Sequence, residues 1–360
     1  MCLQANPVPS SRNSALSRRL STALWIVSLL VSGALGVLAL IPSNYYVLLP
    51  GDALPVGPMI NVKGHPDGHK AGTLSMTDVS LVKVDRKLFE LYYRWFRSDA
   101  TFEPAQQITG GLSQSQFNTV NANYMSDSIY QAEAAALNVV PGYRVTCSPP
   151  GPRIDSVLPH TPAARVLRPG DRIAALNGRH TPCVTQLRAL TKNVKPGTTV
   201  RLNLVRAGHA RTVAVRTVGA TNGQLDPRGK TALIGVTLFD HFIIPVKIAI
   251  QPGDIGGPSA GLMFALGVIQ KLERQDITHG CKIAGTGTID YTGTVGPIGG
   301  AKQKILAARA AGARYFFVPT EADNQGPAKA NAGNVRVVPV KTLKQALMFL
   351  QHVPPCFAKS

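Results

Sequence analysis

Residues 256–261 read Gly-Gly-Pro-Ser-Ala-Gly, and residues 299–304 read Gly-Gly-Ala-Lys-Gln-Lys. The apolar spacing after Ser259 predicts a helix over 259–272, and the spacing after the second Gly-Gly pair predicts a helix over 301–311. Ser259 and Lys304 therefore each lie in the first turn of a predicted helix. Between these helices the chain has short β-branched stretches, so residues 233–356 predict a domain of α/β or α+β class.

Ser259 fits three patterns. A serine at this position can simply cap the helix N-terminus. The run 257–261 also fits the Gly-x-Ser-x-Gly nucleophile elbow of α/β-hydrolases, although that fold needs a strand running directly into the serine and a longer chain. The third pattern is Ser–Lys hydrolysis, in which the neutral amine of Lys304 takes the proton from Ser259. The positive helix end and an apolar surround would both favour the neutral amine.

An apolar, uncharged stretch over residues 20–41 is long enough to cross a hydrocarbon core of roughly 30 Å. Three arginines precede it (Arg12, Arg18 and Arg19), and no basic residue follows before Lys63. The positive-inside rule therefore predicts an uncleaved, single-pass anchor with the N-terminus in the cytoplasm and the rest of the chain outside. A cleaved signal peptide is the main alternative, although no convincing small-x-small cleavage site is found.

The net charge is +19, from 38 Lys and Arg against 19 Asp and Glu. A basic excess of this size is attracted to anionic surfaces. No dense run of Lys and Arg with interleaved aromatic residues occurs, so we expect a solvated surface and no specific nucleic-acid partner. A tether to anionic polymers remains an alternative that depends on the charge alone.

None of the five cysteines belongs to a CxxC pair, which argues against a zinc site, and we expect no metal. Cys147 and Cys183 fall in one predicted domain, and Cys281 and Cys356 fall in another. Outside the cytoplasm these two pairs could form disulfides, and four unpaired thiols are the alternative.

Residues 138–218 predict a compact β-rich module. Thr161-Pro162-Ala163-Ala164 starts a short helix, Pro169-Gly170-Asp171 turns into a strand, and Asn177-Gly178 forms a hairpin turn. This pattern resembles a PDZ domain of the kind carried by envelope proteases. The resemblance implies a groove that takes an extended peptide by strand addition, with residues 140–143 as the candidate carboxylate-binding loop. A rigid spacer is the alternative.

The region between the anchor and this module is less regular. Residues 45–84 contain two strand-like stretches that could join the C-terminal sheet, which would make the module an insertion. Residues 86–97 predict a helix whose aromatic stripe, including Tyr92 and Trp95, packs in a core. Residues 98–130 are polar and predict a loop-rich connection that ends in a helix over residues 129–137.

The C-terminal segment is similar to the proteolytic domain of the Lon family of Ser–Lys peptidases, and more closely to membrane-anchored, PDZ-containing Lon-like proteases that lack an ATPase module. The matching stretches are residues 255–262, 284–289 and 293–304, with Tyr45-Tyr46 and Pro50-Gly51 after the anchor. The resemblance implies that Ser259 is the nucleophile and that Lys304, not Lys302, is the general base. It also implies that the hydroxyl of Thr286 orients this lysine.

The same resemblance extends to the surroundings of the serine. It implies that the backbone at Gly257, Pro258 and Ser259 holds the oxyanion. It also implies that the strand with Val246, Ile248 and Ile250 pairs with the substrate backbone, and that the protein is a homo-oligomer.

The predicted architecture is multi-domain. Its parts are a basic cytoplasmic N-terminus (1–19), a transmembrane signal-anchor (20–41), a membrane-proximal extended and helical region (42–137), a β-rich PDZ domain (138–218), a linker (219–232) and an α/β or α+β Lon-type proteolytic domain (233–356). We expect an ATP-independent serine endopeptidase at the outer face of a bacterial cytoplasmic membrane, acting on unfolded or PDZ-presented proteins. We find no ATP-binding motif and expect no cofactor. A non-enzymatic PDZ scaffold with a silent protease fold is the alternative, which the presence of Ser259, Lys304 and Thr286 disfavours.

Overall fold

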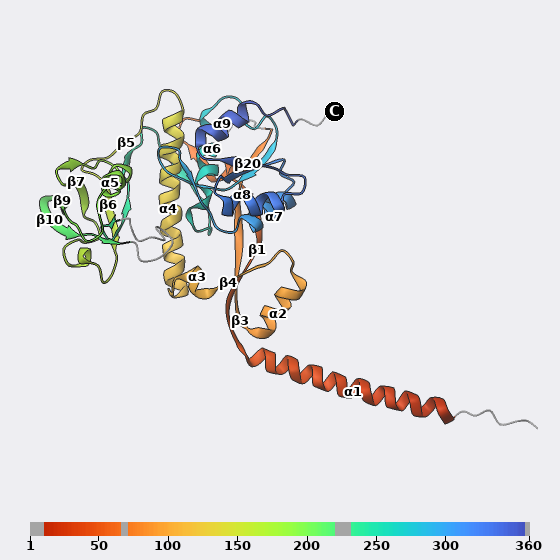
Figure 1. Cartoon of the computed structure of the whole chain (residues 1–360). Coiled ribbons are helices and arrows are strands. Elements are labelled where there is room, and N and C mark those ends of the chain that lie inside the picture. Colours follow the sequence, from red (N-terminus) through yellow and green to blue (C-terminus); the bar gives the residue numbers. More distant parts are fainter. Residues whose placement is uncertain (1–10, 66–70, 220–231, 357–360) are drawn as a thin grey trace, which may run out of the picture.

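The computed structural model describes residues 11–65, 71–219 and 232–356 (Figure 1). Residues 1–10 of the predicted N-terminus and 220–231 of the predicted linker lie outside this part. The described chain begins with α1 (Ser11–Leu40). Its span Ser21–Leu40 is long and apolar enough to cross a membrane, and none of that span is buried against the protein. Length and composition alone fit a signal sequence as well as an anchor.

Six strands form the main sheet, in the order β20, β19, β16, β3, β1, β4. Their bounds are β1 (Pro42–Pro55), β3 (Thr73–Arg86), β4 (Thr101–Pro104), β16 (Lys282–Gly285), β19 (Tyr315–Pro319) and β20 (Arg336–Val340). β3 pairs with β16 in parallel, although the chain between them contains the whole PDZ unit. The strands expected within residues 45–84 therefore do join the C-terminal sheet, and the PDZ unit is an insertion.

Helices cover both faces of this sheet. α6 (Gly261–Leu272) and α9 (Leu343–Gln351) pack on one face, while α7 (Ala301–Ala310) and α8 (Ala322–Ala330) pack on the other. Alternation along β19 explains the layering, because Phe317 packs in the first core and its neighbour Phe316 in the second. The predicted mixed α/β class is confirmed.

The polar segment predicted as a loop-rich connection is mostly helical, so that prediction is wrong. It contains α3 (Ala105–Thr109) and α4 (Gln114–Val139). Ser113 and Gln116 form a capping box at the start of α4, a signal that the sequence does contain. The small side chains of its buried second half, including Ala132 and Ala136, let α4 pack in the core with α6. α4 stands between the PDZ unit and the main unit (Figure 1).

The PDZ unit has a sheet in the order β10, β9, β7, β6, β13, with β8 beside β7. Its elements are β6 (Arg153–Val157), η2 (Pro162–Arg165), β7 (Arg172–Leu176), β8 (Arg179–His180), α5 (Val184–Thr191), β9 (Thr199–Arg206), β10 (His209–Arg216) and β13 (Val236–Phe239). β13 comes from beyond the predicted linker and occupies the edge next to β6. Ile234 and Gly235 lead directly into this edge strand. The candidate carboxylate-binding loop at 140–143 instead ends α4 and leads into no strand of this sheet, so that prediction is wrong.

Short elements connect these units. They are η1 (Gly57–Met59), η3 (Pro258–Ala260) and four two-stranded ladders that pair β2 (Ile60–Val62) with β15 (Ile248–Ile250), β5 (Thr146–Cys147) with β14 (Phe242–Ile243), β11 (Val218–Gly219) with β12 (Ala232–Leu233), and β17 (Thr288–Ile289) with β18 (Val295–Gly296). Disulfides join Cys147 to Cys183 and Cys281 to Cys356, with Cα–Cα distances of 5.7 and 4.8 Å. Of the two alternatives for these cysteines, the structure has the paired one.

The helix predicted over 86–97 is observed as α2 (Lys87–Phe96), but its aromatic stripe faces outward. Tyr92 and Trp95 are 52% and 81% exposed, and the buried side chain of this helix is Glu90. The prediction that these two aromatic residues pack in a core is therefore wrong.

Candidate active site

Ser259 lies in η3, the single turn that leads into α6. Gly257 turns the chain into η3 with a φ of 89°, a conformation that residues with a side chain rarely adopt. A Cβ atom at Gly256 would lie 2.9 Å from the Cβ atom of Asn121, so this glycine lets α4 approach the loop. Within the described part of the chain no side chain caps η3 or α6, so the simple capping role for Ser259 is not observed.

The side chains of Ser259 and Lys304 meet although they lie 45 residues apart. Ser259 Oγ is 2.6 Å from Lys304 Nζ, and this amine also donates to Thr286 Oγ1 at 3.1 Å. The Thr286 hydroxyl in turn donates to the carbonyl oxygen of Ser259 at 3.0 Å. The three predicted residues thus form one hydrogen-bonded cluster in which Thr286 fixes both the lysine and the serine turn.

Lys304 is 4% exposed and lies in the first turn of α7. Burial lowers the pKa of Lys304 to about 7, and the nearby charge of Asp78 opposes this shift. A large fraction of the amine is therefore neutral near neutral pH and has a free lone pair. Lys302 points elsewhere, since its Nζ donates to the carbonyl oxygen of Ser98 at 2.9 Å.

α4 holds the turn before Ser259 through two hydrogen bonds that the sequence did not predict. The Gly257 N–H donates to the Asn121 carbonyl at 2.9 Å, and Ser128 Oγ donates to the Pro258 carbonyl at 2.9 Å. Of the three residues predicted to hold the oxyanion, Gly257 has thus used its N–H and proline has none. The Ser259 N–H, at the positive end of α6, remains as the candidate donor.

A cavity of about 1110 Å³ opens over Ser259 and Lys304. Its walls come from α4, from Asp78 on β3, and from residues 253–258 and 297–300. Val246, Ile248 and Ile250 do not line this cavity, and the last two pair with β2. The structure therefore brings the predicted serine, lysine and threonine together, but it does not bring the predicted substrate strand to the same cavity.

A second cavity, of about 290 Å³, lies where the PDZ unit meets the main unit. It is lined by side chains from β13, α5, α4 and the β17–β18 hairpin, including Leu238, Val184, Arg188, Asp127 and Asp290. Thr288 of β17 lines both this cavity and the larger one, so the two adjoin. A hydrogen bond of 3.1 Å between the hydroxyls of Thr185 and Tyr291 joins the two units beside it.

Three carboxylates line this junction cavity, namely Asp127, Asp240 and Asp290. Burial raises the pKa of Asp127 to about 6 and also raises the pKa of Asp240. Asp240 accepts from the Val184 N–H at 2.7 Å and so holds the start of α5. Three carboxyl groups thus line this cavity, and Arg188 is the lysine or arginine among its described lining residues.

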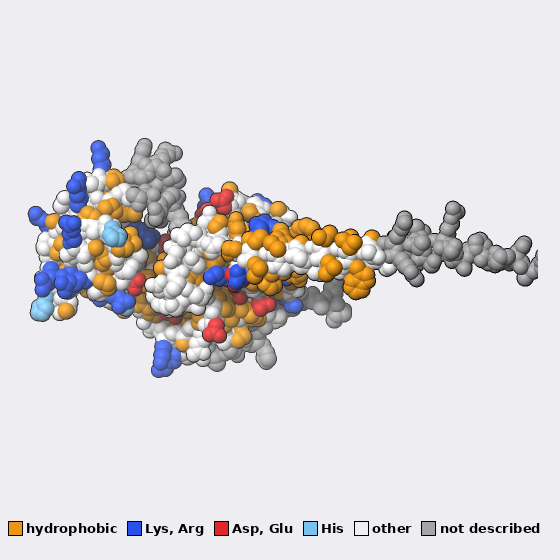
Figure 2. All heavy atoms as spheres, turned by 90° about the horizontal axis from the view of Figure 1, so that it is seen from below, with side chains coloured by type: hydrophobic (Ala, Val, Ile, Leu, Met, Phe, Trp, Pro, Cys, Tyr) orange, Lys and Arg blue, Asp and Glu red, His pale blue; other side chains and the backbone are white. Residues whose placement is uncertain are grey.

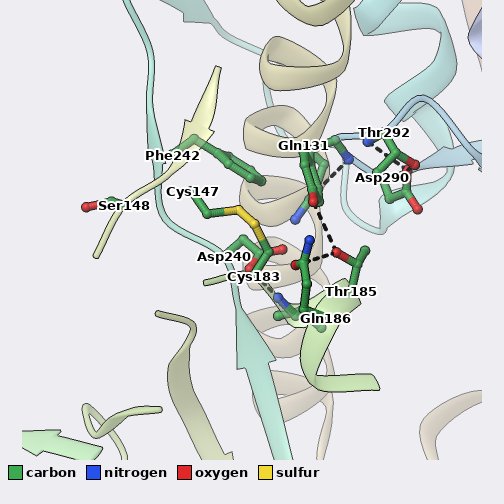
Figure 3. The surroundings of a disulfide bond; sticks show 12 residues. Gln131, Cys147, Ser148, Cys183, Thr185, Gln186, Asp240, Phe242, Asp290 and Thr292 are labelled. Atoms are coloured by element: carbon green, nitrogen blue, oxygen red, sulfur yellow. Dashed lines mark hydrogen bonds between the residues drawn. A yellow bond between two sulfur atoms is a disulfide. The ribbon is translucent and has the colours of Figure 1, made fainter. Parts of the chain in front are cut away.

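The disulfide Cys147–Cys183 lies beside Asp240 (Figure 3). These three residues bring potential ligand atoms within 4.8 Å of one another. Both sulfur atoms are covalently joined, so they cannot act as metal thiolates. The chemistry of this group therefore fits a structural crosslink at the N-terminus of α5.

Comparison with known families identifies both folded units. Residues 196–350 match the family described as the Lon protease (S16) C-terminal proteolytic domain, and residues 136–217 match the PDZ domain family. The chain thus combines a Lon-type serine-peptidase domain with a PDZ domain.

Individual relatives resemble parts of the chain. It is 38% identical over 115 residues to the Lon protease of Roseiflexus castenholzii, covering 31% of this chain and 13% of that protein. It is 31% identical over 173 residues to Lon protease 2 of Thermus thermophilus, covering 47% and 19%. The chain therefore spans less than a fifth of the length of these relatives. A solved PDZ domain of the SdrC-like protein from Listeria monocytogenes is 26% identical, covering 25% of this chain and 90% of that one, with a TM-score of 0.23.

Proposed function

We propose that this chain is an ATP-independent serine endopeptidase, held at the outer face of the cytoplasmic membrane, that cleaves unfolded or PDZ-presented proteins with a Ser259–Lys304 dyad. The observation that carries this proposal is the 2.6 Å contact between Ser259 Oγ and a buried amine whose pKa lies at about 7. A serine becomes a competent nucleophile only when a base can accept its proton at the working pH. The lack of an ATP-binding motif in the sequence supports independence from nucleotide.

The first half of the reaction forms an acyl-enzyme. Ser259 Oγ attacks the carbonyl carbon of the scissile peptide bond while Lys304 Nζ accepts the hydroxyl proton. The Ser259 N–H and the positive end of α6 stabilise the negative charge that develops on the carbonyl oxygen. The ammonium group of Lys304 then donates its proton to the leaving amine, and the C–N bond breaks.

The second half releases the acyl group. A water molecule attacks the ester carbonyl and gives a proton to Lys304, and the lysine returns that proton to Ser259 Oγ as the ester bond breaks. Thr286 would keep the amine aimed at the serine in both halves, because it accepts one of the lysine N–H groups. Thr286 is therefore proposed as a positioning residue.

The outer-face location is supported by two independent features. The apolar span Ser21–Leu40 follows three arginines and precedes the folded units, which favours a cytoplasmic N-terminus. Two disulfides in the folded units suit an oxidising compartment and are rare in the cytoplasm.

The PDZ unit would supply substrate tails to the dyad. The outer edge of β13 has no strand partner among the described residues, and α5 flanks it across the junction cavity. A tail added antiparallel to β13 would have its C-terminus near residues 233–235 and would lead back past Asp240 into that cavity. Residues of α4 and Thr288 line both this cavity and the larger one, so the substrate chain would pass along them to Ser259. The carboxyl groups of the junction cavity would favour a basic side chain in the part of the substrate that lies there.

Cleavage of an unfolded protein by the full chain in lipid nanodiscs, without nucleotide, tests the proposal. Parent protein, Ser259→Ala, Lys304→Ala and Lys302→Ala are compared by gel and mass spectrometry. We expect loss of cleavage in the first two variants, retention in Lys302→Ala, and no change on adding ATP and Mg²⁺. Lys302 is a matched control because it lies on the same helix but donates to Ser98.

Other outcomes separate the alternatives. Cleavage that survives Ser259→Ala would exclude the dyad. An inactive parent that still binds C-terminal peptides would favour the PDZ scaffold. An inactive parent that binds no peptide would contradict both functions.

A further inference from the structure

α2 presents its aromatic side chains outward and a carboxylate inward, the reverse of a helix on the surface of a soluble domain. Phe89, Tyr92, Trp95 and Phe96 are 54%, 52%, 81% and 70% exposed, whereas Glu90 is 2% exposed. Large aromatic side chains gathered on one exposed helix face indicate an apolar partner that covers them.

The rotation of α2 about its axis is fixed by Glu90. Its carboxylate accepts hydrogen bonds from Ser43 at 2.8 Å, Lys87 at 2.9 Å and Arg94 at 3.0 Å. Burial by itself would raise the pKa of Glu90, but these bonds outweigh it and hold the pKa below its ordinary value. The bonds from Lys87 and Arg94 lie within α2 and would survive a rotation of the helix, but the bond from Ser43 on β1 would break. Tyr93 would also leave the cluster of Val47, Leu49 and Val84 against which it packs, so these contacts hold the aromatic face outward.

The start of α2 is tied to the end of α1. The Lys87 N–H donates to the Ile41 carbonyl at 2.9 Å, and the Arg86 guanidinium donates to the Leu40 carbonyl at 3.4 Å. The apolar span ends at Leu40, so α2 begins at the level where a bilayer crossed by α1 has its headgroups. Figure 1 shows α2 beside the exit of α1, and Figure 2 shows hydrophobic side chains along the described part of α1.

We propose that α2 is an interfacial helix whose aromatic face, formed by Phe89, Tyr92, Trp95 and Phe96, inserts into the headgroup region of the bilayer that α1 crosses. Tyrosine and tryptophan favour this region because one end of each side chain is apolar and the other is polar. The proposal rests on the membrane attachment proposed above and is independent of the peptidase activity.

The charged side chains around α2 indicate which lipids insertion would need. Lys87 and Arg94 share the one carboxylate of Glu90, and Arg97 pairs with Asp99 at 2.7 Å. Because these three cations already contact carboxylates of the protein, we expect insertion to depend mainly on the aromatic side chains and not to require anionic lipid. It takes place in zwitterionic phosphatidylcholine and resists high salt, unlike binding through a basic patch.

The two tryptophans of the chain allow a direct test, because Trp25 lies in α1 and Trp95 lies in α2. Full-length Trp25→Phe protein, with Trp95 as its one tryptophan, is placed in phosphatidylcholine nanodiscs. Its fluorescence is quenched either by lipids brominated on the acyl chain near the headgroup or by aqueous iodide. We expect strong quenching by the brominated lipid, weak quenching by iodide, and no change in either at high salt.

Two control proteins calibrate the measurement. Trp95→Phe leaves Trp25, which reports a tryptophan inside the anchor. Trp25→Phe/Trp95→Phe/Met348→Trp places the one tryptophan on α9, at an exposed position of the main unit away from α1 (Figure 1). That tryptophan should respond to iodide and not to brominated lipid.

Two results would overturn the proposal. Trp95 that responds to iodide as strongly as the tryptophan at position 348 would be facing water. Trp95 that is shielded from both quenchers would be covered by protein, such as a second copy of this chain. Neither result depends on catalysis, and quenching of Trp25 by brominated lipid checks separately that the anchor is inserted.

Discussion

The pH dependence of peptide cleavage should follow the protonation of Lys304. The amine accepts the proton of Ser259 only when it is neutral, so kcat/KM rises with pH through the pKa of this group. With a pKa of about 7, roughly one amine in eleven is neutral at pH 6 and roughly ten in eleven at pH 8. We therefore expect kcat/KM to increase about tenfold between these pH values and to level off above them.

Asp78→Asn should shift the rise of kcat/KM to lower pH. The charge of Asp78 stabilises the ammonium form of Lys304 and raises its pKa, so removing the charge lowers the pKa. A larger fraction of the amine is then neutral at pH 6, and the ratio of activity at pH 6 to activity at pH 8 increases. Asparagine keeps a side-chain oxygen that can still accept the backbone N–H of Asp52.

The assay uses an internally quenched peptide that has no group titrating between pH 5 and pH 9. Initial rates at low substrate concentration give kcat/KM for the full chain in nanodiscs, and circular dichroism checks that the fold persists at each pH. A flat profile between pH 6 and pH 8 would refute the assignment of Lys304 as the base. A midpoint that moves to higher pH in Asp78→Asn would refute the electrostatic reasoning.

Three further substitutions test the packing of the site. Ser128→Ala removes the hydrogen bond to the Pro258 carbonyl, and we expect kcat to fall with KM nearly unchanged and a stability loss of about 1 kcal/mol, measured by steady-state kinetics and thermal unfolding. Gly257→Ala forces a side chain into a φ of 89° and should destabilise the domain by about 1–2 kcal/mol, with a larger loss of activity than of folded protein. Lys304→Met should inactivate the enzyme and raise its thermal stability at pH 8 by about 1–3 kcal/mol. Holding the amine neutral at this pH costs about 3 kcal/mol, and the lost hydrogen bonds offset part of the gain.

The stability gain expected for Lys304→Met depends on pH. The folded-state pKa of Lys304 lies below the ordinary value of 10.5, so the unfolded chain binds more protons between about pH 7 and 10.5. The parent protein should gain stability with rising pH across this window. Lys304→Met should lack that gain, and an equal pH dependence in both proteins would contradict the burial argument.

The dyad could be predicted because its signals are local. Ser259 and Lys304 each lie in a short glycine-rich motif next to a helix start, and Thr286 lies in a third matching stretch. The contacts that hold the serine turn could not be predicted, because they join residues far apart in the sequence. Ser128 and Pro258, for example, lie 130 residues apart.

The spacing of apolar residues predicts the position of α2 but not which of its faces is buried. The aromatic stripe predicts which side chains share a face, and the usual inference is that this face is inside. Glu90 overrides that inference, because its hydrogen bond from Ser43 on β1, which is distant in the sequence, holds it in the interior. The PDZ edge was misjudged for a related reason. β13 follows the predicted linker in sequence, far from β6, and its pairing with β6 arises only from the tertiary fold.

The divided main sheet also sets the order in which the enzyme becomes complete during its synthesis. Helix α1 and strands β1 and β3 leave the ribosome first, yet their partner β16 follows only after the PDZ unit. Thr77 and Gly285, which form a hydrogen bond between β3 and β16, are 208 residues apart. Pairing over such a separation is slow, and it must wait for β16 to emerge. Lys304 follows β16 in the chain, and strands β19 and β20 come after it. A growing chain therefore has no assembled dyad until the C-terminal part of its main sheet has been synthesised.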